Sequence, residues 1–309
     1  MESAATRVFC ELAGSPKESS QLEHRRDSDG QPLNQTLSYL ASRALITRLE
    51  DDQWTIHPSL GYDESSLQRV IPSRYRLTFR DRVESTNQLA AELPIPAPPC
   101  RRLVIATQQV AGRGRFDRTW DSPPGGIWAS ILDGENRQPQ TAWIDQLAMS
   151  VAITDVTSCL DVPAGVKWPN DVVTAGGDKL AGILVESTVA GGRLERTICG
   201  VGLNVDIQPE KLPQEATSLA EHCGAVTPIA IVPHLLARYE YRRANPNETL
   251  DTWRSRSVTL GRPVSVELAD RTLSGIAEAL TDDGELVLST QTGQQTISPE
   301  ESRRLRYQD

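Results

Sequence analysis

The 309-residue chain lacks several features that would assign it to a specialised class of protein. No apolar run approaches the ~20 residues that span a bilayer, so we expect no contact with a membrane. The first ten residues lack the basic-then-apolar pattern of a signal peptide. The five cysteines include no C-x-x-C pair, and the four histidines show no metal-ligand spacing. These absences argue against a disulfide framework or a zinc site and predict a cytoplasmic protein.

Positive charge is also scarce. The formal net charge is -9, which argues against non-specific binding of nucleic acid by the whole molecule. A hydrophobic content of 38% and a charged content of 24% are ordinary for a globular protein. The length allows one domain with a sizeable core and one or two smaller domains beside it. A local cluster of basic residues in such a chain therefore needs a specific reason.

The clearest basic cluster lies in residues 109–126, which we call the Gly-Arg loop. Three arginines stand among its glycines: Arg113, Arg115 and Arg118. Glycine lets a backbone approach a ligand closely, with amides pointing at it. Arginine offers a planar fork of donors that matches phosphate and carboxylate groups. The loop follows a strand-like run at 102–107, and we predict that it binds an anionic ligand.

The first of three predicted regions covers residues 1–78. Leucines near helical spacing predict a helix within 31–46, and residues 45–57 are expected to form two short strands around an acidic turn. Helices followed by a two-stranded wing are the outline of a winged helix-turn-helix.

The middle region, residues 79–257, mixes strands with long helices and predicts an α/β core. Strands are expected at 103–107, 127–132, 179–187 and 197–205, and helices at 85–93, 141–160 and 229–243. The last region, residues 258–309, has alternating patterns and an Asp283-Gly284 turn, which together predict a small all-β barrel.

Four further motifs lie in the middle region: Ser85-Thr86-Asn87, Lys167-Trp168-Pro169-Asn170-Asp171, Lys179 to Glu186, and Gly200 to Asn204. Each alone has an ordinary structural interpretation, as a helix cap, a turn, an edge lysine or a strand bulge. Together, in this order and spacing with the Gly-Arg loop, they resemble the motifs of the biotin protein ligase family. Lipoate ligases and octanoyltransferases are expected to share the core fold, but not the Gly-Arg loop or Lys-Trp-Pro-Asn-Asp.

The resemblance implies a fold and an activity. The fold would be a class II synthetase-like α/β (α+β) catalytic domain with a mixed sheet, an N-terminal winged helix-turn-helix-like domain and a C-terminal SH3-like β-barrel. The enzyme would join biotin to ATP, with Mg²⁺, and give biotinyl-5′-AMP and pyrophosphate. It would then transfer biotin to a lysine of the biotin carboxyl carrier protein of acetyl-CoA carboxylase. A homodimer is compatible with this interpretation.

The implied chemistry assigns roles to residues. Cations must gather where the biotin carboxylate attacks the α-phosphate, so Lys179 and Arg115 are the expected catalytic residues. The glycines of the strands are expected to flank biotin because no side chain blocks them. Biotin-binding residues are expected to be Ser85, Thr86, Asn87, Gln109, Arg113, Gly114, Arg115, Lys179, Gly182 and Gly202. ATP-binding and adenylate-binding residues are expected to be Arg113, Arg115, Arg118, Trp120, Lys167, Asn170, Asp171 and Asn204, with Asp171 as the candidate Mg²⁺ ligand.

A second hypothesis is a biotin-sensing transcriptional repressor, either as an added or as the main role. Gln31, Asn34 and Gln35 could contact bases. However, residues 1–80 hold ten Lys and Arg against eleven Asp and Glu, a net charge of -1, and the wing turn at 50–52 is acidic. DNA affinity rests largely on phosphate neutralisation, so the sequence favours a structural winged helix over one that binds an operator. A lipoyl-type ligase or transferase is the third hypothesis.

Overall fold

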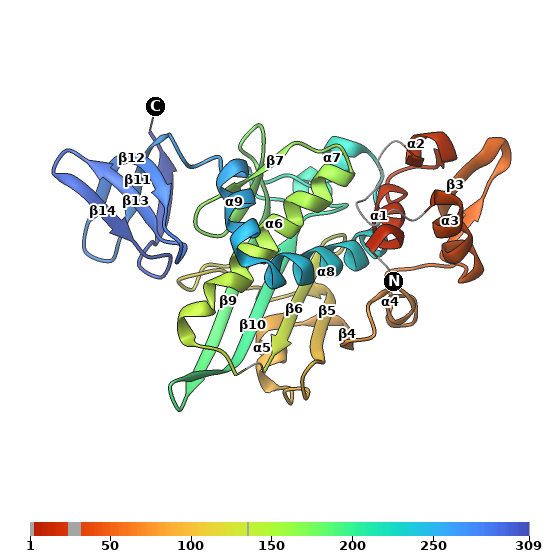
Figure 1. The fold of residues 1–309 in the computed structure, drawn as a ribbon, viewed down its shortest axis with the longest axis horizontal. Helices are drawn as coiled ribbons and strands as arrows, with labels where there is room; N and C mark the ends of the chain where they lie inside the picture. The colour runs from red at the N-terminus through yellow and green to blue at the C-terminus, as the bar shows by residue number, and fades with distance from the viewer. Residues whose placement is uncertain (1–2, 24–31, 135, 309) are drawn as a thin grey trace.

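The computed structural model describes residues 3–23, 32–134 and 136–308. A central sheet and its helices form the middle of the molecule, with the N-terminal helices at one end and a small sheet at the other (Figure 1). Gln31, which we considered as a base-contacting residue, lies outside the described residues. No helix among those described combines the length and apolarity needed to cross a membrane.

The described residues of the N-terminal part form four α-helices and a three-stranded antiparallel sheet of order β1-β3-β2. Its elements are α1 (Ser3–Glu11), β1 (Lys17–Glu18), α2 (Ser19–Glu23), α3 (Leu33–Ser42), β2 (Ile46–Arg48), β3 (Gln53–Ile56) and α4 (Glu64–Val70). The predicted helix and the two strands around an acidic turn are confirmed as α3, β2 and β3. The assignment of this part as a winged helix-turn-helix stays a prediction.

The central sheet is mixed, as expected. Its order is β4-β5-β6-β10-β9-β8-β7, with β4 and β5 parallel and all other neighbours antiparallel. The strands are β4 (Tyr75–Val83), β5 (Arg101–Gln109), β6 (Ile127–Asp133), β7 (Ala164–Lys167), β8 (Asp171–Thr174), β9 (Lys179–Ala190) and β10 (Arg193–Leu203). The four predicted strands are confirmed, whereas β4, β7 and β8 were not predicted. The boundary expected after residue 78 falls inside β4.

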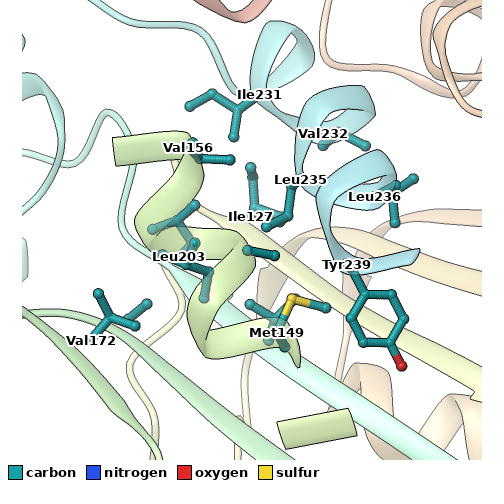
Figure 2. Close-up of a cluster of buried hydrophobic side chains, with 14 of the residues drawn as sticks. Ile127, Met149, Val156, Val172, Leu203, Ile231, Val232, Leu235, Leu236 and Tyr239 are labelled. Carbon is teal, nitrogen blue, oxygen red and sulfur yellow. The ribbon is translucent and has the colours of Figure 1, made fainter. Parts of the chain in front are cut away.

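Helices cover both faces of this sheet. On one face lie α6 (Trp143–Cys159), α8 (Pro228–Ala244) and α9 (Pro246–Arg256), and Figure 2 shows the apolar side chains packed there. On the other face α5 (Thr86–Glu92) covers a smaller cluster that includes Val104 and Ile198. Side chains alternate between the two faces of a strand. Val201 and Leu203 join the larger core, so Gly200 and Gly202 face the α5 side.

The N-terminal helices share the larger core. α1 packs against α8, and the Ala13 carbonyl accepts a hydrogen bond of 3.2 Å from the Thr227 amide. Thr6 Oγ1, in α1, lies 3.4 Å from Nδ1 of His234 in α8. This packing fixes the N-terminal part to the helical face of the central sheet.

The C-terminal part is a five-stranded antiparallel sheet of order β14-β13-β12-β11-β15. Its strands are β11 (Pro263–Glu267), β12 (Thr272–Leu280), β13 (Leu286–Thr290), β14 (Gly293–Ile297) and β15 (Arg304–Tyr307). The Asp283-Gly284 turn is confirmed between β12 and β13, where the φ of +81° at Gly284 suits glycine. The sheet confirms the predicted small all-β part, and the SH3-like barrel stays a prediction.

Candidate active site

One cleft of about 910 Å³ collects the residues predicted from the sequence motifs. It lies beside the start of α5 and the glycines of β9 and β10. Every predicted site residue lines it: Ser85, Thr86, Asn87, Gln109, Arg113, Gly114, Arg115, Arg118, Trp120, Lys167, Asn170, Asp171, Lys179, Gly182, Gly202 and Asn204. The fold therefore brings together motifs that are more than a hundred residues apart, while the role of each residue toward a ligand stays a prediction.

A chain of hydrogen bonds joins the start of α5 to the Gly-Arg loop. Ser85 caps α5, its side chain accepting from the Gln88 amide, as predicted. The amide and hydroxyl of Thr86 donate to Gln109 Oε1, at 2.8 and 3.1 Å. Gln109 Nε2 in turn donates to Ser122 Oγ at 2.7 Å. These bonds fix the orientation of the Gln109 amide, which lines the cleft.

Asn87 is buried, and its polar atoms are bound by the protein. Ser130 Oγ donates to its Oδ1 at 2.6 Å, and its Nδ2 donates to Glu186 Oε2 at 2.7 Å. A Cβ at position 200 would overlap the Asn87 amide, which explains the glycine there. Glu186 also lies 3.4 Å from Arg113 of the Gly-Arg loop. Ser130 and Glu186 therefore hold Asn87 in place from outside the lining of the cleft. Glu186 ends one of the motifs, whereas Ser130 belongs to none of them.

The indole of Trp120 lies on a platform formed by two glycines. Gly182 and Gly202 are direct partners across β9 and β10. A Cβ on these glycines would lie 2.8 and 2.5 Å from atoms of the indole. We expected no side chain over these glycines, and the structure places Trp120 there. Its Nε1 is buried and has no hydrogen-bond partner among the described residues.

Three charged side chains meet beside this platform. Lys179, the first residue of β9, holds its Nζ 2.7 Å from Asp171 Oδ1 and 4.9 Å from the centroid of the Trp120 ring. Lys167, the last residue of β7, pairs in register with Asp171. Burial lowers the pKa of Lys167, and the neighbouring Asp171 carboxylate opposes that effect. The cleft therefore concentrates positive charge around one carboxylate.

The C-terminal part closes the cleft, which the sequence did not predict. Arg115 Nη2 donates to the carbonyls of Pro299 and Ser302, the latter at 3.1 Å. Arg118 Nη2 donates to the Arg303 carbonyl at 2.8 Å. Burial lowers the pKa of Arg115. The C-terminal residues that line the cleft are Arg262, Arg303, Arg304, Leu305, Arg306 and Tyr307. Three arginines within 303–306 of an acidic chain were the available signal.

Asn170 and Asn204 hold the backbone around the cleft. Asn170 Nδ2 donates to the Ile183 carbonyl at 2.9 Å, and Asn204 Nδ2 donates to the Thr217 carbonyl at 2.9 Å. In the described ranges no three His, Cys, Asp or Glu side chains converge on a common metal position. A cation in this cleft would therefore depend on ligand oxygens as well as on Asp171.

Comparison with known proteins yields a consistent set of matches. Residues 79–204 match the biotin/lipoate A/B protein ligase family, and residues 259–298 match the biotin protein ligase C terminal domain. The first match contains every residue of the predicted site.

Individual relatives agree with the family match. The bifunctional ligase/repressor BirA of Bacillus subtilis is 32% identical over 231 residues, which cover 70% of each chain. The biotin--[acetyl-CoA-carboxylase] ligase of Mycobacterium tuberculosis is 37% identical over 204 residues, covering 60% of this chain and 72% of the relative. The biotin protein ligase from Aquifex aeolicus, solved with biotin and ATP, superposes with a TM-score of 0.62 at 26% identity, over 75% of this chain and 99% of that one.

Proposed function

The chain belongs to the biotin protein ligase family and is a biotin protein ligase, and we propose that its cleft carries out both half-reactions at the residues described above. In the first half-reaction the biotin carboxylate attacks the α-phosphate of ATP, forming biotinyl-5′-AMP and releasing pyrophosphate. In the second, the amine of a carrier lysine attacks the activated carbonyl and releases AMP. The observation that carries the proposal is the convergence of all five motifs on one cleft.

Lys179 is the residue that we propose for bridging the two reacting anions. Its ammonium lies between the Asp171 carboxylate and the Trp120 ring, at the edge of the glycine platform. A carboxylate and a phosphate repel each other, so a cation between them lowers the barrier to their approach. Arg113, Arg115 and Arg118 would surround the phosphates from the Gly-Arg loop. Closure of that loop would keep water from the mixed anhydride.

The remaining roles follow from the chemistry of each ligand. Ser85, Thr86 and Gln109 would offer donors and acceptors to the ureido group of biotin, and Asn87 and Gly114 line the same cleft. Trp120, whose indole lies over Gly182 and Gly202, would provide an apolar wall for biotin. The nucleotide would be bound by Trp120, Lys167, Asn170, Asp171 and Asn204. Mg²⁺ would enter with the ATP phosphates, with Asp171 as its protein ligand, because Mg²⁺ commonly combines one or two carboxylates with phosphate oxygens and water.

One incubation tests this function. The chain is mixed with labelled biotin, ATP, Mg²⁺ and an apo biotin carboxyl carrier protein. We expect labelled carrier and pyrophosphate, both requiring ATP, and biotinyl-5′-AMP when the carrier is omitted. Labelled lipoate or octanoate in parallel tests the lipoyl-type hypothesis. Transfer of those acyl groups without transfer of biotin would overturn the proposal.

For the N-terminal part we propose a structural winged-helix-like module. Asn34 and Gln35 are exposed on α3, as base-contacting residues would be. The exposed turn at 50–52, however, presents three carboxylates where a DNA-binding wing would need cations. A gel shift with the DNA upstream of biotin genes, with biotin and ATP present, tests this proposal. A saturable, sequence-specific shift would favour the repressor instead.

We also propose a cytoplasmic location for the reaction. All five cysteines are free thiols, as expected in a reducing compartment.

A further inference from the structure

Lys167 carries a half-buried charge without a carboxylate of its own. Its register partner Asp171 is paired with Lys179 at 2.7 Å. In the part of the chain that the structure describes, no carboxylate lies within ion-pair distance of Lys167. A flexible lysine with no fixed partner would lose conformational entropy on binding a ligand. Some other group must therefore hold its ammonium in place if Lys167 is to act as a defined contact.

That group is an aromatic ring from the C-terminal sheet. The Nζ of Lys167 lies 4.9 Å from the centroid of the Tyr307 ring. The guanidinium of Arg262 lies 4.3 Å from the centroid of the same ring. Lysine and arginine cations are attracted to the electron-rich face of an aromatic ring at such distances. Tyr307 thus gathers two cations at the wall of the cleft.

Hydrogen bonds of the neighbouring residues hold Tyr307 and Lys167 next to each other. Tyr307 pairs with Val264 across β15 and β11. On the other side, the amide and the indole of Trp168, next to Lys167, donate to Thr259 Oγ1 at 3.0 Å and to the Gly284 carbonyl at 3.1 Å. The strand that ends at Lys167 is therefore docked on the C-terminal part beside the ring.

An aromatic partner differs from a carboxylate in one respect that matters for catalysis. A carboxylate would neutralise the ammonium and compete with an anionic ligand. A ring face fixes the position of the ammonium and leaves its net charge available. Carbonyl oxygens do the same for Arg115 and Arg118 of the Gly-Arg loop.

We propose that Tyr307 is a positioning residue for the ligase reaction, which holds Lys167 ready to bind the nucleotide. The inference rests on the proposed function, because it takes the anion at Lys167 to be ATP or its adenylate. It assigns the C-terminal sheet a direct part in the first half-reaction.

Two substitutions in the full-length enzyme distinguish the contribution of the Tyr307 ring from that of its hydroxyl. Tyr307→Leu removes the ring and keeps an apolar side chain, whereas Tyr307→Phe keeps the ring. Biotinyl-5′-AMP formation is measured against ATP concentration. We expect Tyr307→Leu to raise KM for ATP about tenfold with kcat within about twofold, and Tyr307→Phe to restore most of the loss. A fall in kcat alone, equal in both variants, would indicate a merely structural role and overturn the proposal.

A double substitution tests whether Tyr307 acts through Lys167. In a Lys167→Met background, Tyr307→Leu should change KM for ATP by less than about twofold. Two independent, additive losses would contradict the proposal.

A third measurement needs neither a Tyr307 variant nor activity. Reductive methylation with ¹³C places reporter methyl groups on the lysine amines, and the Lys167 signal is the one missing in Lys167→Arg. A ring face shifts that signal upfield from those of exposed lysines. A signal at the exposed position would refute the contact. A wild type that makes no biotinyl-5′-AMP but keeps the shifted signal would refute the proposed function and leave the contact standing.

Discussion

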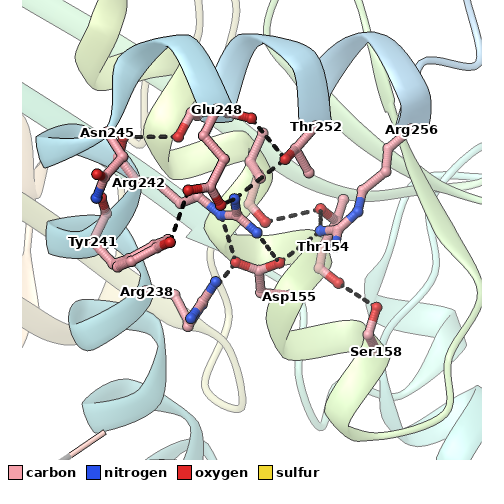
Figure 3. Close-up of polar contacts among 12 residues, drawn as sticks. Thr154, Asp155, Ser158, Arg238, Tyr241, Arg242, Asn245, Glu248, Thr252 and Arg256 are labelled. Atoms are coloured by element: carbon pink, nitrogen blue, oxygen red, sulfur yellow. Dashed lines mark hydrogen bonds and ion pairs between the residues drawn. The ribbon is translucent and has the colours of Figure 1, made fainter. Parts of the chain in front are cut away.

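Arginines on the helical face of the central sheet and arginines at the mouth of the cleft have different kinds of partner. On the helical face, Asp155 of α6 binds Arg238, Arg242 and Arg256 at 2.7 to 2.9 Å (Figure 3). We call these four residues the Asp155 cluster. At the cleft, Arg115 and Arg118 are bound by backbone carbonyls, and Arg262 lies on an aromatic ring.

The difference separates charge used for stability from charge kept for a ligand. In the Asp155 cluster a buried carboxylate meets its cations directly, so the charges join α6, α8 and α9. At the cleft, carbonyls and a ring orient Arg115, Arg118 and Arg262 without neutralising them. Lys179 and Arg113 differ from these arginines, because the carboxylates of Asp171 and Glu186 lie beside them. Residue type alone would not distinguish the two sets, because both are arginine-rich. The partner decides the role, and each of the following substitutions tests one side of this comparison.

Removing the carboxylate of the Asp155 cluster should have the largest effect, and on stability. Asp155→Ala leaves three cations packed around an empty position. Breaking a buried ion pair by removing one partner costs about 3–5 kcal/mol. We expect the free energy of unfolding in urea to fall by about that amount. Asp282→Ala, which removes an exposed partner of Arg254, is the control and should change little. Equal losses in both variants would contradict the distinction.

Removing Lys179 from the cleft should have the reverse effect, a large loss of activity with little loss of stability. Lys179→Ala deletes the cation that we place between carboxylate and phosphate, and loss of one such group commonly lowers kcat by about 10²–10³-fold. Because Lys179 is half-buried at a strand end, we expect an almost unchanged melting temperature. Biotinyl-5′-AMP formation and thermal unfolding are measured on the same sample, with exposed Lys211→Ala as the control. Near-normal adenylate formation would remove Lys179 from the mechanism.

Much of the central fold could be predicted because local patterns decide it. Apolar runs and helical spacing indicated β5, β6, β9, β10, α6 and α8, although their bounds differ by a few residues. The β7–β8 hairpin was missed because its strands have four residues each and enclose a Pro-Asn turn. β4 was missed because this edge strand carries Arg76, Arg80 and Arg82, and its burial pattern shows no regular alternation.

The composition of the cleft could be predicted better than its internal contacts. Motif residues are visible in the sequence, and the resemblance to a family gathers them. The position of Trp120 over Gly182 and Gly202 depends on how a loop folds back onto two strands. The contact of Arg115 with residues near 300 joins segments that are far apart in the chain. Local propensity contains no information about such contacts.

Acid should weaken the Asp155 cluster in a defined pH range. Burial alone would raise the pKa of Asp155, but the hydrogen bonds and charges of Arg242 and Arg238 outweigh it and lower the pKa from 3.8 to about 2. Because the folded value is the lower one, the stabilisation is complete well above pH 4 and is lost as the pH falls toward 2. The difference corresponds to about 2 kcal/mol in total, of which about 1 kcal/mol should be lost between pH 5 and pH 3. Urea unfolding of wild type and Asp155→Ala at both pH values measures it, and a pH-independent gap between the two would contradict this prediction.

The smallest of these effects concerns retention of the intermediate. Arg115 ties the Gly-Arg loop to the carbonyls of Pro299 and Ser302, and hydrogen bonds from a charged donor contribute about 1.5–3 kcal/mol. Part of this is replaced by water in Arg115→Ala, so we expect release of biotinyl-5′-AMP to become about tenfold faster in a filter-retention assay.

The control for this assay is Arg196→Ala, since Arg196 also donates to a backbone carbonyl, that of Ala91, but lies outside the cleft. Arg113→Gly should raise release less than Arg115→Ala, because Arg113 pairs with the half-exposed Glu186 and does not reach the C-terminal part. If Arg113→Gly released the adenylate as fast as Arg115→Ala, retention would depend on charge in the loop and not on its attachment to the C-terminal sheet. Arg113 and Arg115 would then contribute equally to retention, although one is bound by a carboxylate and the other by backbone carbonyls.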